Sequence, residues 1–136
     1  MGLNMKKPSK RWLEFHQLIE IIDIRIGKKQ RELVKLKNRF QGLIDSIDEK
    51  WELITHEQQR LKSLVVKDEF NGLSRLFQRR ESVKSCIESL FFDVSVARQN
   101  ADELELEIEQ VVVEKRRLEK RKDALGEIQE QLRDEE

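Results

Sequence analysis

Proline, cysteine and aromatic residues are scarce in this sequence. Tyrosine is absent, and proline and cysteine each occur once among 136 residues. The single cysteine, Cys86, allows neither an internal disulfide nor a cysteine-based metal cluster, so packing alone must hold the fold together. A lone cysteine also makes a reducing compartment the simpler interpretation.

Long apolar segments are missing as well. No apolar run approaches the roughly 20 residues that a membrane-spanning helix needs. The N-terminal segment contains the basic residues Lys6 and Lys7 but has no apolar run behind them, and Lys6 stands where N-myristoylation expects Ser or Thr. We therefore expect a soluble, cytoplasmic protein.

Charge is abundant but balanced. Charged residues make up 40% of the chain, and the formal net charge is zero. A chain this polar can bury only narrow apolar stripes, which favours a thin rod of helices over a sphere. Intrinsic disorder is the competing interpretation, but the apolar residues are periodic and the net charge is not large.

Heptads fill the first half of the chain. Pro8 and Ser9 are typical of a helix start, because serine can cap a helix and proline is tolerated in its first turn. An apolar residue then recurs every seven positions, which predicts a left-handed supercoil. This a series contains Met5, Trp12, Ile19, Ile26, Leu33, Phe40, Ile47, Ile54 and Leu61. The weaker d series contains Phe15, Ile22, Lys29, Leu36, Leu43, Lys50, Glu57 and Leu64.

The heptads return in a new phase after Asn71 and Gly72, which form a turn signal. One series of the second half contains Leu76, Val83, Leu90, Ala97, Leu104, Val111, Leu118, Leu125 and Leu132. The other contains Leu73, Arg80, Ile87, Val94, Ala101, Ile108, Lys115, Lys122 and Gln129. Leu at d with mostly β-branched or small residues at a favours a two-stranded seam.

The two halves match when the chain is folded at its midpoint. Ile54 then faces Val83, the large Phe40 faces the small Ala97, and Leu64 faces Leu73. Glu57 faces Arg80 at the one place where both seam residues are charged. We predict an all-α fold in which two long helices form one antiparallel coiled-coil hairpin over residues 1–136. Helix 1 is expected at about 9–66, the tip at about 67–72, and helix 2 at about 73–133.

The charge distribution supports the antiparallel arrangement. Residues 1–46 carry 11 basic and 5 acidic side chains, whereas residues 101–136 carry 7 basic and 13 acidic ones. Antiparallel folding lays the basic arm along the acidic arm, whereas a parallel dimer would place arms of the same net charge side by side. A single uninterrupted helix that dimerises in parallel stays the alternative.

No catalytic constellation is present. His16 and His56 are far apart and no cysteine accompanies either, so we expect no metal site. The alternating glutamates within residues 103–109 surround a helix and form no pocket for acid–base catalysis, and no glycine-rich phosphate loop occurs. We expect no enzyme, cofactor or small-molecule substrate. Nucleic-acid binding is not expected either, because the acidic arm would cancel much of the field of the basic runs.

Some apolar residues cannot be buried by the predicted seam. Such residues on a helical rod commonly mark a place where another protein docks. Trp51 and Phe91 flank the seam and could simply widen the core, whereas the outward row of Phe92, Leu106 and Val113 is harder to bury. The candidate partner surface contains Trp51, Phe70, Phe77, Phe91, Phe92, Leu106 and Val113.

The whole chain resembles the stalk proteins of bacterial type III secretion and flagellar export ATPases, the FliJ, YscO and SpaM group. The similar stretches are Trp51 followed by residues 57–61, residues 67–70 before 73–76, and the charged run 114–121. The resemblance implies a bacterial, non-catalytic stalk that couples a hexameric secretion ATPase to an export-gate protein, with secretion chaperones as further partners. The paired ends, residues 6–12 and 125–136, would enter the ATPase ring. A structural coiled coil that self-associates through its outer apolar row is the alternative.

Overall fold

Two long helices make up almost all of the described chain. The computed structural model describes residues 8–67 and 70–135, and it contains no strand within these ranges. Helix α1 spans Lys10–Ser63 and helix α2 spans Gly72–Glu135. The predicted all-α helical hairpin is confirmed. Met5, Lys6 and two residues of the predicted tip, Asp68 and Glu69, lie outside the described residues.

Ser9 begins α1 as its N-cap. Its Oγ accepts a hydrogen bond from the backbone N–H of Trp12 at 3.1 Å, and its carbonyl accepts one from the N–H of Leu13 at 3.1 Å. The side chain thus satisfies a backbone donor that has no partner inside the helix. The start predicted from Pro8 and Ser9 agrees with this geometry.

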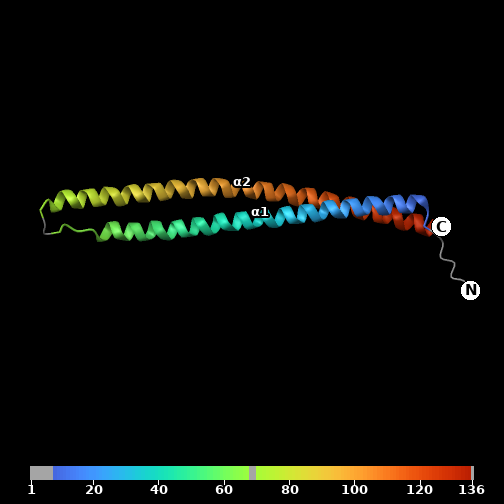
Figure 1. Cartoon of the computed structure of the whole chain (residues 1–136), viewed down its shortest axis with the longest axis horizontal. Helices are drawn as coiled ribbons and strands as arrows, with labels where there is room; N and C mark the ends of the chain where they lie inside the picture. Colours follow the sequence, from blue (N-terminus) through green and yellow to red (C-terminus); the bar gives the residue numbers. More distant parts are fainter. Residues whose placement is uncertain (1–7, 68–69, 136) are drawn as a thin grey trace, which may run out of the picture. The chain divides into compact units, whose positions relative to one another are not determined.

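The helical pair divides into two compact units. Unit 1 contains Met1–Lys37 and Leu106–Glu136, and unit 2 contains Asn38–Glu105. Within each unit a stretch of α1 lies alongside a stretch of α2 that runs in the opposite direction (Figure 1). In unit 1 the contacts of Asp23 with Lys122 and of Lys29 with Glu114 demonstrate this order, because the residue numbers rise on one helix and fall on the other.

The predicted seam supplies the core. Among the described residues, every buried apolar side chain occupies a predicted seam position. They are Ile22, Leu33, Leu36, Ile47, Ile54, Val83, Ile87, Val94, Ala97, Ala101 and Val111. The main cluster lies in unit 2 and contains Ile47, Ile54, Val83, Ile87, Val94 and Ala97, with Leu61 and Leu90 among the residues packed against it.

The predicted register is wrong by about one heptad in both units. It places Lys29 opposite Ile108 and Asp23 opposite Glu114, whereas Lys29 contacts Glu114 and Asp23 contacts Lys122. In unit 2 it places Trp51 opposite Cys86, whereas Trp51 contacts Phe91 and Arg98.

The prediction fails beside the tip. Helix α1 ends at Ser63 rather than near residue 66, and Leu73, expected to face Leu64 in the seam, is 74% exposed. Because Leu64 already belongs to the connection, no helical turn of α1 remains to cover Leu73. Arg80 is exposed as well, and Glu57 pairs with His56 and Arg60 of its own helix, each at 3.6 Å. A long cation such as Arg80 can keep its charge in water while its helix packs.

Asn71 and Gly72 close the tip by different means. Asn71 adopts a positive φ of 58°, a conformation that asparagine tolerates better than most residues. Its carbonyl accepts the first hydrogen bond of α2, from the N–H of Arg75 at 3.0 Å. Gly72 is buried, and a Cβ at this position would collide with the carbonyl oxygen of Lys67. The turn therefore needs a residue without a side chain where α2 begins.

Candidate functional site

Two of the predicted surface residues meet across the helices of unit 2. Trp51 of α1 and Phe91 of α2 directly follow the seam residues Lys50 and Leu90. Their rings contact each other edge-on, with centroids 5.6 Å apart and planes at 79°. Edge-to-face contact is a favoured geometry for aromatic pairs and adds roughly 0.5–1.5 kcal/mol to the burial of the rings. Both rings stay partly exposed, so the pair widens the core and also presents a surface.

Phe92 and Arg98 extend this surface. Phe92, next in sequence to Phe91, is 68% exposed. The guanidinium carbon of Arg98 lies 5.9 Å from the centroid of the Trp51 ring, within the range of a cation–π contact. We name Trp51, Phe91 and Phe92 the aromatic edge. Arg98 was not among the predicted surface residues, although it follows seam residue Ala97 as Phe91 follows Leu90, and this shared position was the available signal.

The two candidates near the tip are also exposed. Phe70 in the connection is 84% exposed, and Phe77 in the second turn of α2 is largely exposed. Val65, Val66 and Leu73 of the same short stretch are exposed too. The tip therefore offers more apolar surface than Phe70 alone, because α1 ends early and leaves its last apolar residues without a helical partner.

Leu106 and Val113 belong to unit 1 and lie on α2. Both are exposed, Leu106 more than Val113, as their outward heptad position predicts. Ile21, Ile24 and Val34 of α1 are exposed in the same unit.

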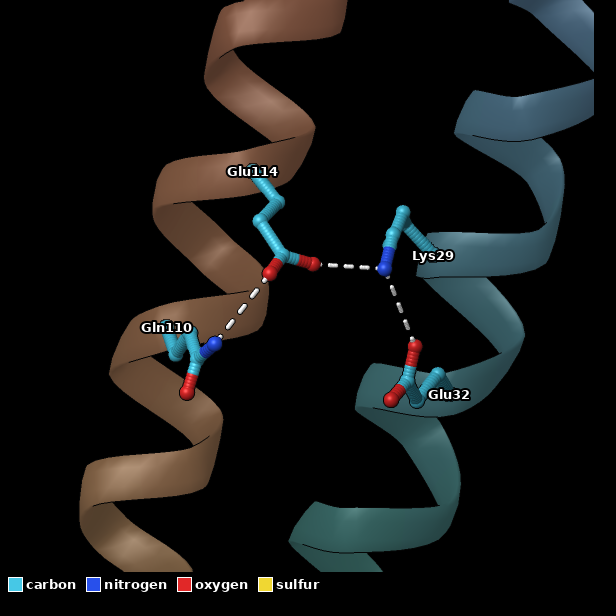
Figure 2. Close-up of polar contacts among 4 residues, drawn as sticks. All are labelled: Lys29, Glu32, Gln110 and Glu114. Carbon is cyan, nitrogen blue, oxygen red and sulfur yellow. Dashed lines mark hydrogen bonds and ion pairs between the residues drawn. The ribbon is translucent and has the colours of Figure 1, made fainter.

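Ion pairs join the helices of unit 1. The Nζ of Lys29 lies 2.5 Å from a carboxylate oxygen of Glu114 and 3.6 Å from a carboxylate oxygen of Glu32 (Figure 2). The side-chain amide of Gln110 donates a hydrogen bond to the other carboxylate oxygen of Glu114 at 3.3 Å. Lys122 of α2 lies 2.6 Å from Asp23 of α1. The first pair joins a base of the N-terminal arm to an acid of the C-terminal arm, as the net charges predict, whereas the second has the opposite sense.

The hydrogen bond between Lys29 and Glu114 shifts both pKa values. Donation from the Nζ of Lys29 to Glu114 raises the pKa of Lys29 above its ordinary 10.5, although desolvation partly opposes this. The same bond lowers the pKa of Glu114 below its ordinary 4.5. The hydrogen bond with Asp23 likewise raises the pKa of Lys122. These groups are close to solvent, so screening reduces what they contribute to stability.

The pair of Lys29 and Glu114 predicts a defined dependence of stability on pH. A lowered folded pKa at Glu114 stabilises the fold above about pH 4.5, and this contribution is lost as pH falls through the folded pKa. A raised folded pKa at Lys29 stabilises it below about pH 10.5, and this contribution is lost as pH rises through the folded pKa. Glu114→Gln should therefore lower the urea midpoint at pH 7, and the difference from the parent chain should shrink as pH falls through the folded pKa of Glu114. Glu103→Gln, a change at an exposed glutamate, is the control, and an equal effect of both substitutions at pH 7 would contradict the prediction.

Neither a group of potential metal ligands nor a membrane-spanning segment occurs in the described residues. Within residues 8–67 and 70–135, no three His, Cys, Asp or Glu side chains are grouped as metal ligands would be. Neither helix, over the part that the structure describes, contains a segment long and apolar enough to cross a bilayer. Comparison of the chain with protein-family models, with curated proteins and with solved structures found no match.

Proposed function

We propose that the chain is a non-catalytic stalk or adaptor of a bacterial type III protein secretion apparatus. In this proposal it works in the cytoplasm and couples the hexameric secretion ATPase to the export-gate protein, with secretion chaperones as further partners. The proposal rests on the resemblance to export-ATPase stalks and on the helical hairpin, a fold that can present contacts along its surface. It needs no catalytic group on this chain.

The aromatic edge is the observation that carries the proposal. A chain in which 40% of the residues are charged keeps Trp51, Phe91 and Phe92 at its surface in unit 2. Trp and Tyr, with Arg, are the residues most enriched among the side chains that dominate binding energy at protein interfaces. The pair of Trp51 with Phe91 is already ordered by its own edge-on contact, so binding would lose little side-chain entropy there.

Different parts of the chain serve different partners in this proposal. The paired ends in unit 1, up to Trp12 and from Leu125 onward, face the ATPase ring. The aromatic edge in unit 2 contacts the gate protein. Residues 6 and 7 of the ring-facing end lie outside the described residues.

Binding to the cognate ATPase tests the proposed role. The purified chain is expected to bind the assembled hexamer from the same bacterium and to change its rate of ATP hydrolysis. Sedimentation and a phosphate-release assay measure the two properties. A chain that neither binds the hexamer nor changes its turnover would exclude the role.

Truncating the side chains of the aromatic edge should separate binding to the gate protein from the effect on the ATPase. The variant Trp51→Ala, Phe91→Ala, Phe92→Ala is expected to weaken binding to the gate protein by at least about tenfold, because aromatic anchors dominate such interfaces. Its effect on ATP turnover should be small. Leu53→Ala removes another exposed apolar side chain of unit 2 and serves as the control. Circular dichroism verifies that the helices remain, and gate binding that survives all three substitutions would contradict the assignment.

Self-association is the second candidate function, favoured by the exposure of Leu106 and Val113 in unit 1 and of Phe92 in unit 2. Exposed apolar side chains on a helix can be covered by a second copy of the same chain. Light scattering distinguishes the two functions. A stable oligomer that dissociates when Leu106 and Val113 are replaced by glutamate would favour assembly, whereas a monomer at micromolar concentration would favour the adaptor.

A further inference from the structure

One edge of unit 1 contains a groove with cationic walls. Arg25 and Lys28 of α1 form one wall, and Arg117 and Arg121 of α2 form the other. Side chains on a helix lean toward its N-terminus. Because α1 and α2 are antiparallel within unit 1, the side chains from residues 25–28 and those from 117–121 lean toward the same level of the groove. We name this feature the basic groove.

The four cations of the basic groove are only partly balanced by charges of the protein itself, since Glu114 interacts electrostatically with Arg117. All four are exposed, and within the described part of the chain none of their side chains forms an ion pair or a hydrogen bond. Arg121 has no acidic residue at helical neighbour spacing, because the residues three and four positions away are Arg117, Leu118, Ala124 and Leu125. Arg117 and Lys28 each have one, Glu114 and Glu32 respectively, so the lining keeps an excess of positive charge. Like charges one turn apart repel each other. A bound group with several negative charges would remove this repulsion.

The floor and the far end of the basic groove are different in character. Half-buried Leu118 lines the floor together with the methylene stems of the surrounding long side chains. At the far end Lys29 is neutralised by Glu32 and Glu114, so this end carries no free positive charge (Figure 2). The groove is therefore basic along its walls and apolar at its base, and at one end its positive charge is compensated by carboxylates.

We infer that the basic groove binds an acidic amphipathic helix of a partner protein. A helix presents carboxylates at i and i+3 or i+4, which are about 5–6 Å apart, and the cations on each wall have the same spacing. Its apolar stripe would cover Leu118, and its glutamates would reach both walls, as charged residues beside a helix seam do. Neither a free phosphate chain nor a nucleic acid backbone has an apolar face to match Leu118 on the floor.

The inference deepens the proposed function by stating the chemistry of one partner surface, and it rests on that function only in assuming that the chain binds another protein. Because the groove is in unit 1 and the aromatic edge is in unit 2, the two surfaces can be altered separately. An assay with a synthetic helix needs no ATPase and no gate protein. Failure of one proposal is thus distinguishable from failure of the other.

A titration of the full chain with a synthetic peptide tests the inference. The probe is a cross-linked helix of about four turns with leucines on one stripe and glutamates on both sides of it. We expect saturable amide shifts in the NMR spectrum of the labelled chain, confined to residues 25–32 and 114–121, at about 0.15 M salt, where distant charges are screened. The same peptide with glutamine at each glutamate should bind at least about tenfold more weakly.

Matched variants localise the site. Arg25→Gln with Arg121→Gln should weaken binding of the acidic peptide by at least about tenfold. Arg39→Gln with Arg80→Gln removes the same charge from exposed positions in unit 2 and should leave the affinity unchanged. No saturable binding, or shifts spread over all basic residues, would overturn the inference. Saturable binding of tripolyphosphate that depends on Arg25 and Arg121 and exceeds that of the peptide would overturn it in favour of a phosphate site.

Discussion

Replacing Ile54 with alanine is expected to lower the free energy of unfolding by about 2–5 kcal/mol. Ile54 is 1% exposed and is the largest fully buried side chain of the described residues. It lies in the main cluster of unit 2 with Val83 and Ile47, so truncation leaves a cavity between helices that have no other layer to close it. Urea denaturation followed by circular dichroism measures the change.

The neighbouring residue provides the control. Leu53 is 52% exposed, and Leu53→Ala removes a similar volume from the same turn of α1. Surface substitutions of this kind usually change stability by less than about 0.5 kcal/mol. Equal destabilisation by the two variants would mean that position 54 does not lie in the interior of the hairpin.

A charge inside the seam should be more damaging still. Val94→Asp places a carboxylate at a position that is 4% exposed, between apolar neighbours in the main cluster of unit 2. A buried charge without a partner typically destabilises a protein by about 3–5 kcal/mol. We expect most of the helical ellipticity that unit 2 contributes to be lost at a moderate temperature. Circular dichroism at 222 nm during thermal unfolding measures this loss.

Val96→Asp makes the identical exchange two residues away, at a position that is 40% exposed. Aspartate and valine have similar helix propensities, so helix formation alone predicts little difference between the variants. The control should therefore melt within a few degrees of the parent chain. A Val96→Asp variant as unstable as Val94→Asp would contradict the assignment of the two faces of α2.

The heptads predicted the fold because a seven-residue repeat specifies which face of a helix is buried. Each buried apolar residue from Ile22 to Val111 was a predicted seam position, since a two-helix fold has no other interior. Periodicity carries this information without any knowledge of long-range contacts. The pairing of Phe40 with Ala97 and of Ile54 with Val83, which assumed a tight turn at the midpoint, was wrong by about one heptad, because α1 already ends at Ser63 while α2 begins at Gly72.

The tip was harder to predict because its geometry depends on the backbone. The repeat continues through Leu64 and into Leu73, yet α1 ends at Ser63. The chain must reverse between helices, and the collision that any side chain at Gly72 would make with the Lys67 carbonyl indicates how tightly the tip is packed. No heptad pattern describes such a constraint, so Leu73 and Arg80 were wrongly placed in the seam.

For the partner surfaces, the sequence predicted where residues lie on each helix but not which side chains contact or approach one another. Sequence spacing placed Trp51 and Phe91 beside the seam, and their edge-on contact required the rotamers of both rings. The basic groove was missed because Arg25 and Arg121 are far apart in sequence and were assigned to separate charged runs. Only the antiparallel packing inside unit 1 reveals that their side chains lean toward one groove.

Cross-linking within unit 2 tests the antiparallel hairpin and its register most directly. In a chain with Cys86→Ser, the pair Ile47→Cys and Ala97→Cys, both in the main cluster, should form a disulfide within one molecule at high dilution. The pair Phe40→Cys and Ala97→Cys, which the midpoint register would bring together, is shifted by one heptad, about 10 Å along the helix, which exceeds the reach of a disulfide. Rapid intramolecular oxidation of the first pair but not the second is the predicted result. Disulfides that form only between molecules, or that form equally well in both pairs, would contradict the fold on which the proposed partner surfaces depend.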